Sequence, residues 1–495
     1  MSKELVMIIL SVIYMGVSVI VGTWFTRRQK STEEYFLAGK SAGPVVLGIA
    51  SAAGLTSGWA FIGNPGMGYQ IGLGYLTAMA IIPFSAFIPW MLFARKFRIL
   101  ADTHSCMTVP DVISARFNSE TLTLLCSIGV LFGLIAYTAA QFMALGYLFG
   151  VVFGLRYEVG LLVGVAIIGA YTVSGGQRGI LWTNVIQGTL MILAAVGGFF
   201  FAWILIGGPG PAYSGMKSID PKLVTFTGKS PIGWWISYIV VSIMGAAARM
   251  AFLPRFFMIK SMNDLKWAPV FSPICGVIMG VLGWSVPFVY LGLQAQGAAP
   301  PLVEADECMP TFLMLFTPSI LAGVLMAGAL AATMSTAAVY MNIGAATLVN
   351  DLGMRHLKLR FKNPVAAARW ATVLFTIVAV ILGLTAGEFV MMMGLAAVGV
   401  WASTVGAVLT FGLLWKGTTK EGAIAGASIG LIFSIGIAML GMYGIYKLPY
   451  GIIPGAVGAL LSFLTVFIVS LYTQKTPMDE KMDRVVALPL IARGM

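Results

Sequence analysis

Charged, histidine and cysteine residues are scarce in this sequence. Of 495 residues only 10% are Asp, Glu, Lys or Arg, whereas 59% are hydrophobic, which is far outside the range of soluble domains. The chain holds two histidines and four cysteines, and the cysteines show neither the spacing of a metal site nor an obvious pairing. These shortages argue against a soluble domain, a zinc site and a disulfide framework, and they favour a membrane protein.

Apolar segments of about 20 residues recur along the whole chain, as a bilayer core of roughly 30 Å requires. We therefore predict an all-α integral membrane protein surrounded by a lipid bilayer. The first segment is too long and too weakly flanked for a cleaved signal peptide, so we retain it as a spanning helix. We predict 13 transmembrane helices, at residues 5–25, 43–63, 73–94, 121–150, 157–175, 179–206, 232–254, 267–293, 310–345, 364–386, 389–414, 421–442 and 450–471.

The positions of Lys and Arg predict the orientation of these spans. With the N-terminus outside and the spans alternating, most basic residues fall in inner loops, as the positive-inside rule requires. The net charge of +12 then reflects basic residues gathered on the inner side of the membrane, so nucleic acid is not expected as a partner. We predict a multi-pass protein of the cell (inner) membrane, with a cytoplasmic C-terminus. We expect a short surface helix within 99–119, loops at 207–231 and 294–309, and a loose tail from residue 473 onward.

Acidic side chains and histidines are absent from the predicted membrane interior. Every Asp and Glu falls in a loop or at the end of a span, and both His104 and His356 fall in inner loops. Carriers coupled to protons usually relay them through an intramembrane Asp, Glu or His. A sodium ion needs only oxygen ligands, which backbone carbonyls at a helix break and Ser or Thr hydroxyls supply. The sequence therefore favours sodium as the coupling ion, with no organic cofactor.

The second predicted span contains small and polar residues where helix formers are expected. Its sequence from 48 to 66 is GIASAAGLTSGWAFIGNPG, in which Gly54, Thr56, Ser57 and Gly58 weaken the helix. Unwound backbone at membrane depth is tolerated only where it lines a cavity or meets protein. We favour a deliberate helix break whose carbonyls face an ion or substrate. Tight helix packing through small residues is the alternative.

Two further polar clusters lie in apolar spans. Ser335 and Thr336 are adjacent hydroxyls in the segment AATMST, residues 331–336, where packing and hydrogen bonding to the same helix are alternatives to a ligand role. Asn184 and Gln187 follow a glycine pair in GGQRGILWTNVIQG, residues 175–188. Hydrogen bonding between helices is the alternative interpretation of that pair.

Four short motifs together resemble the sodium:solute symporter family, which includes sodium/proline, sodium/pantothenate and sodium/galactose carriers. They are EYFLAGKSAG at 34–43, SGWAFIGNPG at 57–66, LWTNVIQG at 181–188 and AATMSTAA at 331–338. The resemblance implies a leucine-transporter-type fold, in which two inverted five-helix repeats place the substrate at broken helices. It divides the single transporter domain of residues 1–495 into an extra helix at 5–25, repeats at 43–206 and 232–414, two helices within 421–471 and a cytoplasmic tail at 472–495.

The resemblance also implies a sodium site. The site falls on the backbone carbonyls of Ala53, Thr56 and Ala332 and on the hydroxyls of Ser335 and Thr336.

Three departures from the family pattern qualify this site. Asn184 stands where the family commonly has an Asp that supports a sodium site, and Ala338 and Val339 stand where members with a second site carry Ser. We therefore expect one sodium ion. Leu55 replaces the Asp of the sodium/proline carriers, which argues against a proline-like or other cationic amine substrate.

Arg249 lies in SIMGAAARMAFLPRF, residues 242–256, six residues before the inner-end residue Arg255. It is either an arginine that reaches the inner edge of the membrane or a substrate anchor. Because no intramembrane acid is expected to pair with it, a bidentate carboxylate is its natural partner. We predict that Trp59, Ser57, Tyr137, Thr138 and Gln141 complete the substrate pocket.

The sequence therefore predicts a symporter that imports a small organic anion, such as a monocarboxylate or pantothenate, with Na⁺. Alternatives are a symporter of a neutral solute, such as a zwitterionic amino acid or a sugar, and a membrane sensor on a transporter scaffold. An enzyme is disfavoured, because no nucleophile–base–acid set falls in the membrane. The expected partners are Na⁺, the solute and lipid, and the protein is expected to be able to act as a monomer.

Overall fold

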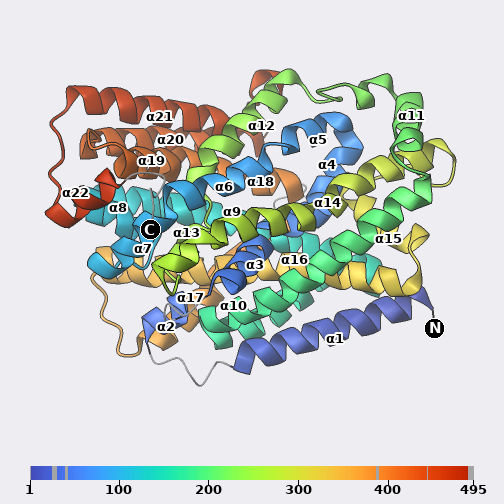
Figure 1. Cartoon of the computed structure of the whole chain (residues 1–495), viewed down its shortest axis with the longest axis horizontal. Coiled ribbons are helices and arrows are strands. Elements are labelled where there is room, and N and C mark those ends of the chain that lie inside the picture. The colour runs from blue at the N-terminus through green and yellow to red at the C-terminus, as the bar shows by residue number, and fades with distance from the viewer. Residues whose placement is uncertain (1, 25–30, 39–42, 386–389, 443, 489–495) are drawn as a thin grey trace.

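The computed structural model describes residues 2–24, 31–38, 43–385, 390–442 and 444–488, and these residues contain no β-strand. Long apolar helices make up most of this all-helical bundle (Figure 1). They are α1 (Lys3–Trp24), α9 (Glu120–Phe153), α10 (Tyr157–Ile206), α14 (Ala268–Ala295), α16 (Ser319–Ala346), α17 (Pro364–Thr385), α20 (Lys420–Met442) and α21 (Pro454–Tyr472).

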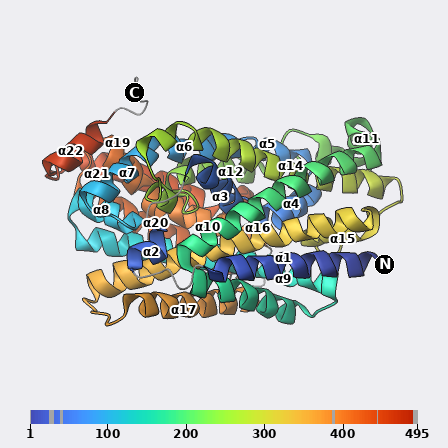
Figure 2. The ribbon, with the colours of Figure 1, turned by 60° about the horizontal axis from the view of Figure 1, so that its bottom comes forward.

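Other membrane segments are built from shorter helices in series. Figures 1 and 2 show them between the long helices, with α7, α8 and α22 at one end of the bundle and α11 and the N-terminus at the other. They are α3 (Pro44–Leu55), η2 (Trp59–Gly63), α4 (Asn64–Ile71), α5 (Leu73–Met79), α6 (Ile82–Leu92), α7 (Ala94–Thr103), α12 (Ile232–Met244), η4 (Gly245–Ala248), α13 (Leu253–Phe256), η7 (Thr347–His356), α18 (Val390–Trp401), η8 (Ala402–Gly406) and α19 (Ala407–Leu414).

The number of spans depends on how the bends are counted. Within the described residues, 11 helices are long and apolar enough to cross a membrane, or up to 12 if the bent pair at 44–71 is one span. Helix α10 contains Gly176 at φ 53° and ψ −159°, between the predicted spans 157–175 and 179–206. A positive φ favours glycine, so the predicted turn is present as a kink. The count of 13 and the repeat boundaries stay predictions.

Two predicted spans have different extents in the structure. The broken segment predicted to end at residue 63 continues as α4 to Ile71, because Pro65 occupies the first turn of α4, where proline is tolerated. The segment predicted at 310–345 consists of α15 (Cys308–Phe316) and α16, separated by Thr317 and Pro318 in extended conformation.

The polar segments contain short helices. The short helix predicted within 99–119 is present as α8 (Val109–Phe117), after the end of α7, and the segment at 207–231 holds α11 (Pro209–Ile219). The tail is not loose between residues 480 and 487, where α22 (Glu480–Ala487) packs against α7 and α19. Its buried residues are Met482, Val485 and Val486, so burial of one apolar face explains the helix.

Candidate functional site

The predicted break in the second span lies at Thr56 and Ser57. Helix α3 ends there because Thr56 has an extended backbone, with ψ 94°, and the chain becomes helical again at Gly58. The N–H of Thr56 still donates to the carbonyl of Ala52 (2.8 Å). The N–H of Gly58, which precedes η2, donates to Oε1 of Gln141 at 2.7 Å. A side chain from α9 thus stabilises backbone that the break leaves without a helical partner.

A second break interrupts the segment that begins with α12. The four residues of η4 form a tight 3-10 turn, and Arg249 then takes φ −68° and ψ 102° before α13 begins at Leu253. The structure therefore places Arg249 in an unwound stretch between η4 and α13. This backbone sits within the protein, where residues 245–259 are all buried, so it satisfies the condition for irregular backbone at membrane depth.

The predicted sodium ligands meet where α3 ends against α16. The hydroxyl of Ser335 donates to the carbonyls of Ala53 (2.9 Å) and Ala332 (3.0 Å), and the hydroxyl of Thr336 donates to the carbonyl of Gly54 (3.2 Å). The last carbonyls of a helix have no partner within it, which explains why side chains of α16 reach them. Three of the five predicted positions are thus joined directly, and a fourth, Thr336, contacts Gly54, which was not among the predicted ligands.

The fifth predicted position, Thr56, lies one residue beyond this turn and is buried with 4% of its surface exposed. Together the five positions offer only oxygen atoms, the ligands that hard cations prefer.

A cavity lies between the two breaks. Thr56, Ser57 and Trp59 line it from the first break and Arg249 from the second. Among the described lining residues Arg249 is the one charged side chain, and no carboxylate is present. An otherwise apolar cavity with one guanidinium favours an anionic group.

Arg249 is held in this cavity by a single polar contact among the described residues. Its side chain is 6% exposed, and its Nη2 donates to Oγ of Ser85 on α6 at 3.1 Å. Its Nε is buried without a hydrogen-bond partner. A buried guanidinium with unused donors is costly unless an acceptor joins it. The structure thus places Arg249, the predicted substrate anchor, in the wall of this cavity.

The other predicted substrate residues divide into two groups. Ser57, Trp59 and Tyr137 line the cavity, and Oγ of Ser57 lies 3.2 Å from the hydroxyl of Tyr137. Thr138 and Gln141 are buried but are not among the lining residues; Gln141 instead binds the backbone at the first break.

Three polar or aromatic lining residues were missed, two of which come from distant elements. Asn64, Tyr238 and Trp284 lie on α4, α12 and α14 and line the cavity. Asn64 is the one with a detectable signal, since a polar residue directly before Pro65 in an apolar span is unusual.

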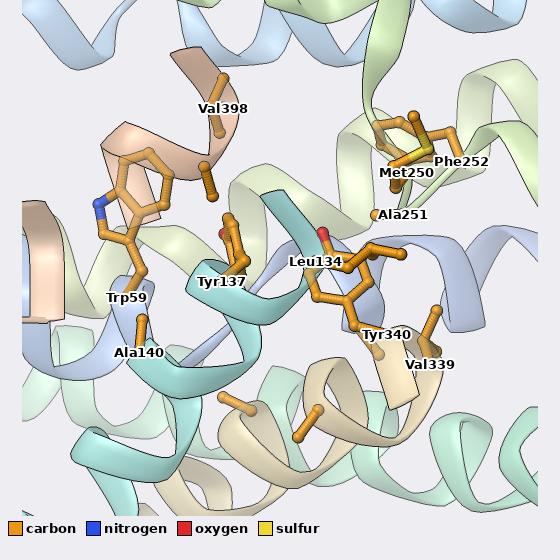
Figure 3. Packing of buried hydrophobic residues seen from close by; sticks show 14 of the residues in the cluster. Trp59, Leu134, Tyr137, Ala140, Met250, Ala251, Phe252, Val339, Tyr340 and Val398 are labelled. Carbon is orange, nitrogen blue, oxygen red and sulfur yellow. The ribbon is translucent and has the colours of Figure 1, made fainter. Parts of the chain in front are cut away.

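Aromatic rings pack behind the lining residues. The ring of Tyr137 lies 5.9 Å from Trp59, 5.0 Å from Tyr340 and 5.8 Å from Trp401, measured between centroids. Figure 3 shows Tyr137 between Trp59 and the segment that carries Met250 and Phe252. Such contacts restrict ring motion, so the cavity wall on this side is largely pre-formed.

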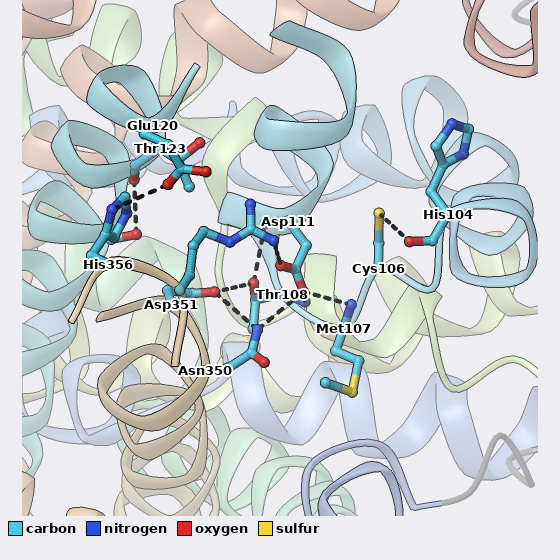
Figure 4. A network of polar contacts seen from close by, with 12 residues as sticks. His104, Cys106, Met107, Thr108, Asp111, Glu120, Thr123, Asn350, Asp351 and His356 are labelled. Carbon is cyan, nitrogen blue, oxygen red and sulfur yellow. Dashed lines mark hydrogen bonds and ion pairs between the residues drawn. The ribbon is translucent and has the colours of Figure 1, made fainter. Parts of the chain in front are cut away.

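A polar cluster joins α8 to η7 (Figure 4). Nη2 of Arg355 lies 2.6 Å from Oδ1 of Asp111, and the hydroxyl of Thr108 donates to Asp351 at 2.7 Å. Asn350 donates to both carboxylates at 3.2 Å. Asp351 lies within a helical segment that continues α16 and is fully buried, so this acid is deeper in the fold than its expected place at the end of a span.

Comparison with known proteins gives the family. The model of the sodium:solute symporter family matches residues 35–430. This chain belongs to the sodium:solute symporter family. The high-affinity proline transporter PutP of Bacillus subtilis (strain 168) is 27% identical over 92% of this chain and 96% of its own. The sodium/pantothenate symporter of Escherichia coli (strain K12) is 28% identical over 92% of this chain and 93% of its own.

Solved structures confirm the fold. A Na⁺-coupled sialic acid symporter, solved in a substrate-bound outward-open state, has a TM-score of 0.77 with 18% identity, over 96% of this chain and 98% of its own. MhsT in complex with L-phenylalanine has a TM-score of 0.56 with 15% identity, over 87% and 98%. The predicted leucine-transporter-type fold is therefore correct. By its family this protein is a sodium-coupled solute symporter, a multi-pass protein of the cell membrane, and its relatives are transporters rather than enzymes.

Proposed function

We propose that this protein imports a small organic anion, of the monocarboxylate or pantothenate class, together with one sodium ion. The observation that carries the proposal is Arg249, the one charged side chain among the described residues that line the cavity. Its unpartnered Nε faces no acid that would neutralise it. A carboxylate accepts two parallel hydrogen bonds from a planar guanidinium. Because Arg249 lines the cavity and no described lining residue is acidic, we expect the cavity to bind an anion.

The sodium ion in this proposal binds between α3 and α16. Carbonyl oxygens of Ala53, Thr56 and Ala332 and the hydroxyls of Ser335 and Thr336 serve as its ligands. Support comes from the hydrogen bonds that already bring these hydroxyls to the end of α3. A single ion is proposed because Asn184 carries no charge and because Ala338 and Val339 offer no hydroxyl for a second site.

Coupling follows from the position of the first break. Sodium ligands and substrate-lining residues are neighbours along one short stretch, since Ala53 and Thr56 come shortly before Ser57 and Trp59, and Thr56 also lines the cavity. An ion that fixes the carbonyls at the end of α3 also fixes the orientation of the residues that follow. Sodium and solute therefore bind more tightly together than separately, which is the thermodynamic requirement for coupled binding. Transport then proceeds by alternating access around this site, with the N-terminus outside.

A zwitterionic solute such as proline is the second candidate, because relatives named as proline transporters match almost the whole chain. Its carboxylate would also suit Arg249. Its ammonium group would have no carboxylate among the described lining residues, which leaves that charge to carbonyls and aromatic faces. We therefore rank the anion first.

Uptake into proteoliposomes tests the proposal. Purified protein is given radiolabelled short monocarboxylates, pantothenate or proline, with an inward sodium gradient or with choline in place of sodium. An anion is expected to accumulate only with sodium. One sodium ion moving with one monoanion carries no net charge, so an inside-negative potential set by potassium and valinomycin should not accelerate uptake. A net charge would gain roughly 2.3 kcal/mol per 100 mV, and strong stimulation would indicate a neutral solute or a second sodium ion.

The dependence of uptake on sodium concentration separates these two outcomes. One site predicts a hyperbolic sodium curve with a Hill coefficient near one. A coefficient clearly above one would contradict a single ion. Equal uptake driven by a proton gradient in sodium-free buffer would contradict the sodium ligands altogether.

A further inference from the structure

Arg255 places a positive charge directly beside the proposed sodium site. Its side chain is 1% exposed, and its Nη1 donates to the carbonyl of Ala50, one turn before the end of α3. Its Nη2 lies so close to Gly54 that a Cβ added to that glycine would be 2.5 Å away. The guanidinium therefore lies against the helical turn whose final carbonyls, from Ala53 and Gly54, face α16.

No acid neutralises this guanidinium within the part of the chain that the structure describes. The ion pairs found there do not include Arg255. Its side-chain neighbour is Asn184, which is fully buried. When the amide is oriented to satisfy its partners, Oδ1 of Asn184 accepts from Nη2 of Arg255 at 3.1 Å, and its nitrogen donates to Oε1 of Gln187 at 3.0 Å. A full positive charge thus has only neutral oxygen atoms around it.

The guanidinium also lines a narrow second cavity, together with Gln177, Met258 and Val339. This cavity also reaches Thr108 and Thr347, beside the polar cluster between α8 and η7. No acidic side chain is among its described lining residues, so the cavity supplies no charge that would neutralise Arg255.

We propose that Arg255 is a built-in cation beside the sodium site, which holds the last turns of α3 through the carbonyl of Ala50 and lowers the affinity for sodium by repulsion. This inference rests on the sodium site of the proposed function and names its regulation. Sodium must bind next to a fixed charge of the same sign in a buried place, where such repulsion is poorly screened. Asn184 leaves that repulsion uncompensated, because it can solvate the guanidinium but cannot neutralise it.

Direct binding of radioactive sodium to the purified full-length protein tests this inference without any organic solute. Chloride and ionic strength are held constant with choline. Asn184→Asp introduces a carboxylate beside Arg255 and is expected to lower the sodium Kd about ten-fold or more, which corresponds to ~1.4 kcal/mol. Arg255→Gln removes the charge but keeps an amide donor for Ala50, and it is expected to lower the Kd in the same direction.

Combining the two changes gives a sharper test. If the introduced carboxylate acts by neutralising the guanidinium, Asn184→Asp should improve affinity less in the Arg255→Gln background than in the wild type. Such non-additivity is the signature of two groups that interact. Arg116→Gln is the matched control, because Arg116 is also buried and donates to carbonyls of Gly412 (2.8 Å) and Thr418 (3.2 Å), on α19 and just beyond it. Its sodium Kd should equal that of the wild type.

Two results would overturn the inference. Unchanged sodium Kd values in both Asn184→Asp and Arg255→Gln, with melting temperatures like the wild type, would show that the charge of Arg255 does not affect sodium binding. Loss of sodium binding in a folded Arg255→Gln protein would make the guanidinium a support of the site. Failure of the proposed site looks different: sodium binding would then survive Ser335→Ala combined with Thr336→Ala.

Discussion

The hydroxyl of Ser335 on α16 lies 2.9 Å from the carbonyl oxygen of Ala53, at the end of α3. The two residues are far apart in the chain, yet the contact joins a helix that is broken to one that is continuous at this point. Any ion that binds these oxygens therefore acts on the position of α3 relative to α16. In the proposed mechanism, sodium occupancy and the shape of the solute cavity are linked through this contact region.

Removing the hydroxyls should raise the sodium requirement. Ser335→Ala combined with Thr336→Ala deletes two proposed ligands while preserving an apolar helix, so the sodium concentration for half-maximal uptake should rise about ten-fold or more. Thr333→Ala is the control, because the Thr333 hydroxyl donates to the carbonyl of Leu330 in its own helix at 2.8 Å. The dependence of uptake on sodium concentration is measured for the wild type, the double variant and Thr333→Ala. An unshifted curve in the double variant would show that the sodium site lies elsewhere.

Replacing Arg249 should weaken solute binding far more than sodium binding. Arg249→Ala breaks a buried charge-assisted pair, which typically costs about 2–5 kcal/mol, a loss of roughly 30-fold or more in affinity. Arg249→Lys keeps the charge but loses the fork, so an intermediate loss is expected. Ser85→Ala is a control that removes the hydroxyl contacting Arg249 but leaves the charge of Arg249 in place. The solute Kd at saturating sodium is measured for all three variants. A wild-type Kd in Arg249→Ala would contradict the proposed role of Arg249 as a substrate anchor.

The first helix break was predictable because its cause is local. Gly54, Thr56 and Ser57 remove helix formers from one short stretch, and the scarcity of acids and histidines leaves only hydroxyls and carbonyls as ion ligands. What could not be read from the chain depends on contacts between distant elements. Gln141 stabilises the break from α9, and Trp284 reaches the cavity from α14. The charge on Arg255 becomes informative only when the fold places it against Gly54.

The tail was misjudged for a related reason. Residues 480–487 are polar and short, and an isolated helix of this length is unstable in water. Nζ of Lys96 on α7 donates to the carbonyls of Val485 (3.0 Å), Val486 (2.9 Å) and Leu413 (2.8 Å), so the helix exists because tertiary contacts hold its C-terminal end.

Removal of that lysine should release α22. Lys96→Met keeps an apolar chain but leaves three buried carbonyls without their donor, at a cost of about 2 kcal/mol or more. Trypsin should then cut faster after Lys481 and Arg484. Lys416→Met is the control, because Lys416 also contacts α22, through Asp483 at 2.7 Å, but as a half-exposed ion pair of little worth. Equal cleavage rates in Lys96→Met and the wild type would show that α22 docks without the lysine.

Asp306 should make the thermal stability depend on pH. This acid lies in the connection between α14 and α15, 2% exposed, with Oδ2 accepting from the N–H of Val390 at 3.0 Å and Oδ1 unpartnered. Burial, with a smaller effect from Glu304, raises its pKa from 3.8 to about 7. Because the folded state holds the proton more tightly than the unfolded state, stability should fall as pH rises from about 4 to 7 and level off above that.

Asp306→Asn isolates this contribution. The amide resembles the protonated acid, keeps an acceptor for Val390 and cannot ionise, so the variant should lose less of its melting temperature than the wild type between pH 5 and pH 8. Glu304→Gln serves as the control for the neighbouring acid; it should lower the pKa of Asp306 only slightly and retain most of the wild-type slope. Tyr147 and Cys308 also interact with Asp306, but they should remain neutral throughout this pH range. Melting curves of the detergent-purified proteins measure the difference, and identical slopes in the wild type and Asp306→Asn would show that Asp306 does not titrate in this window.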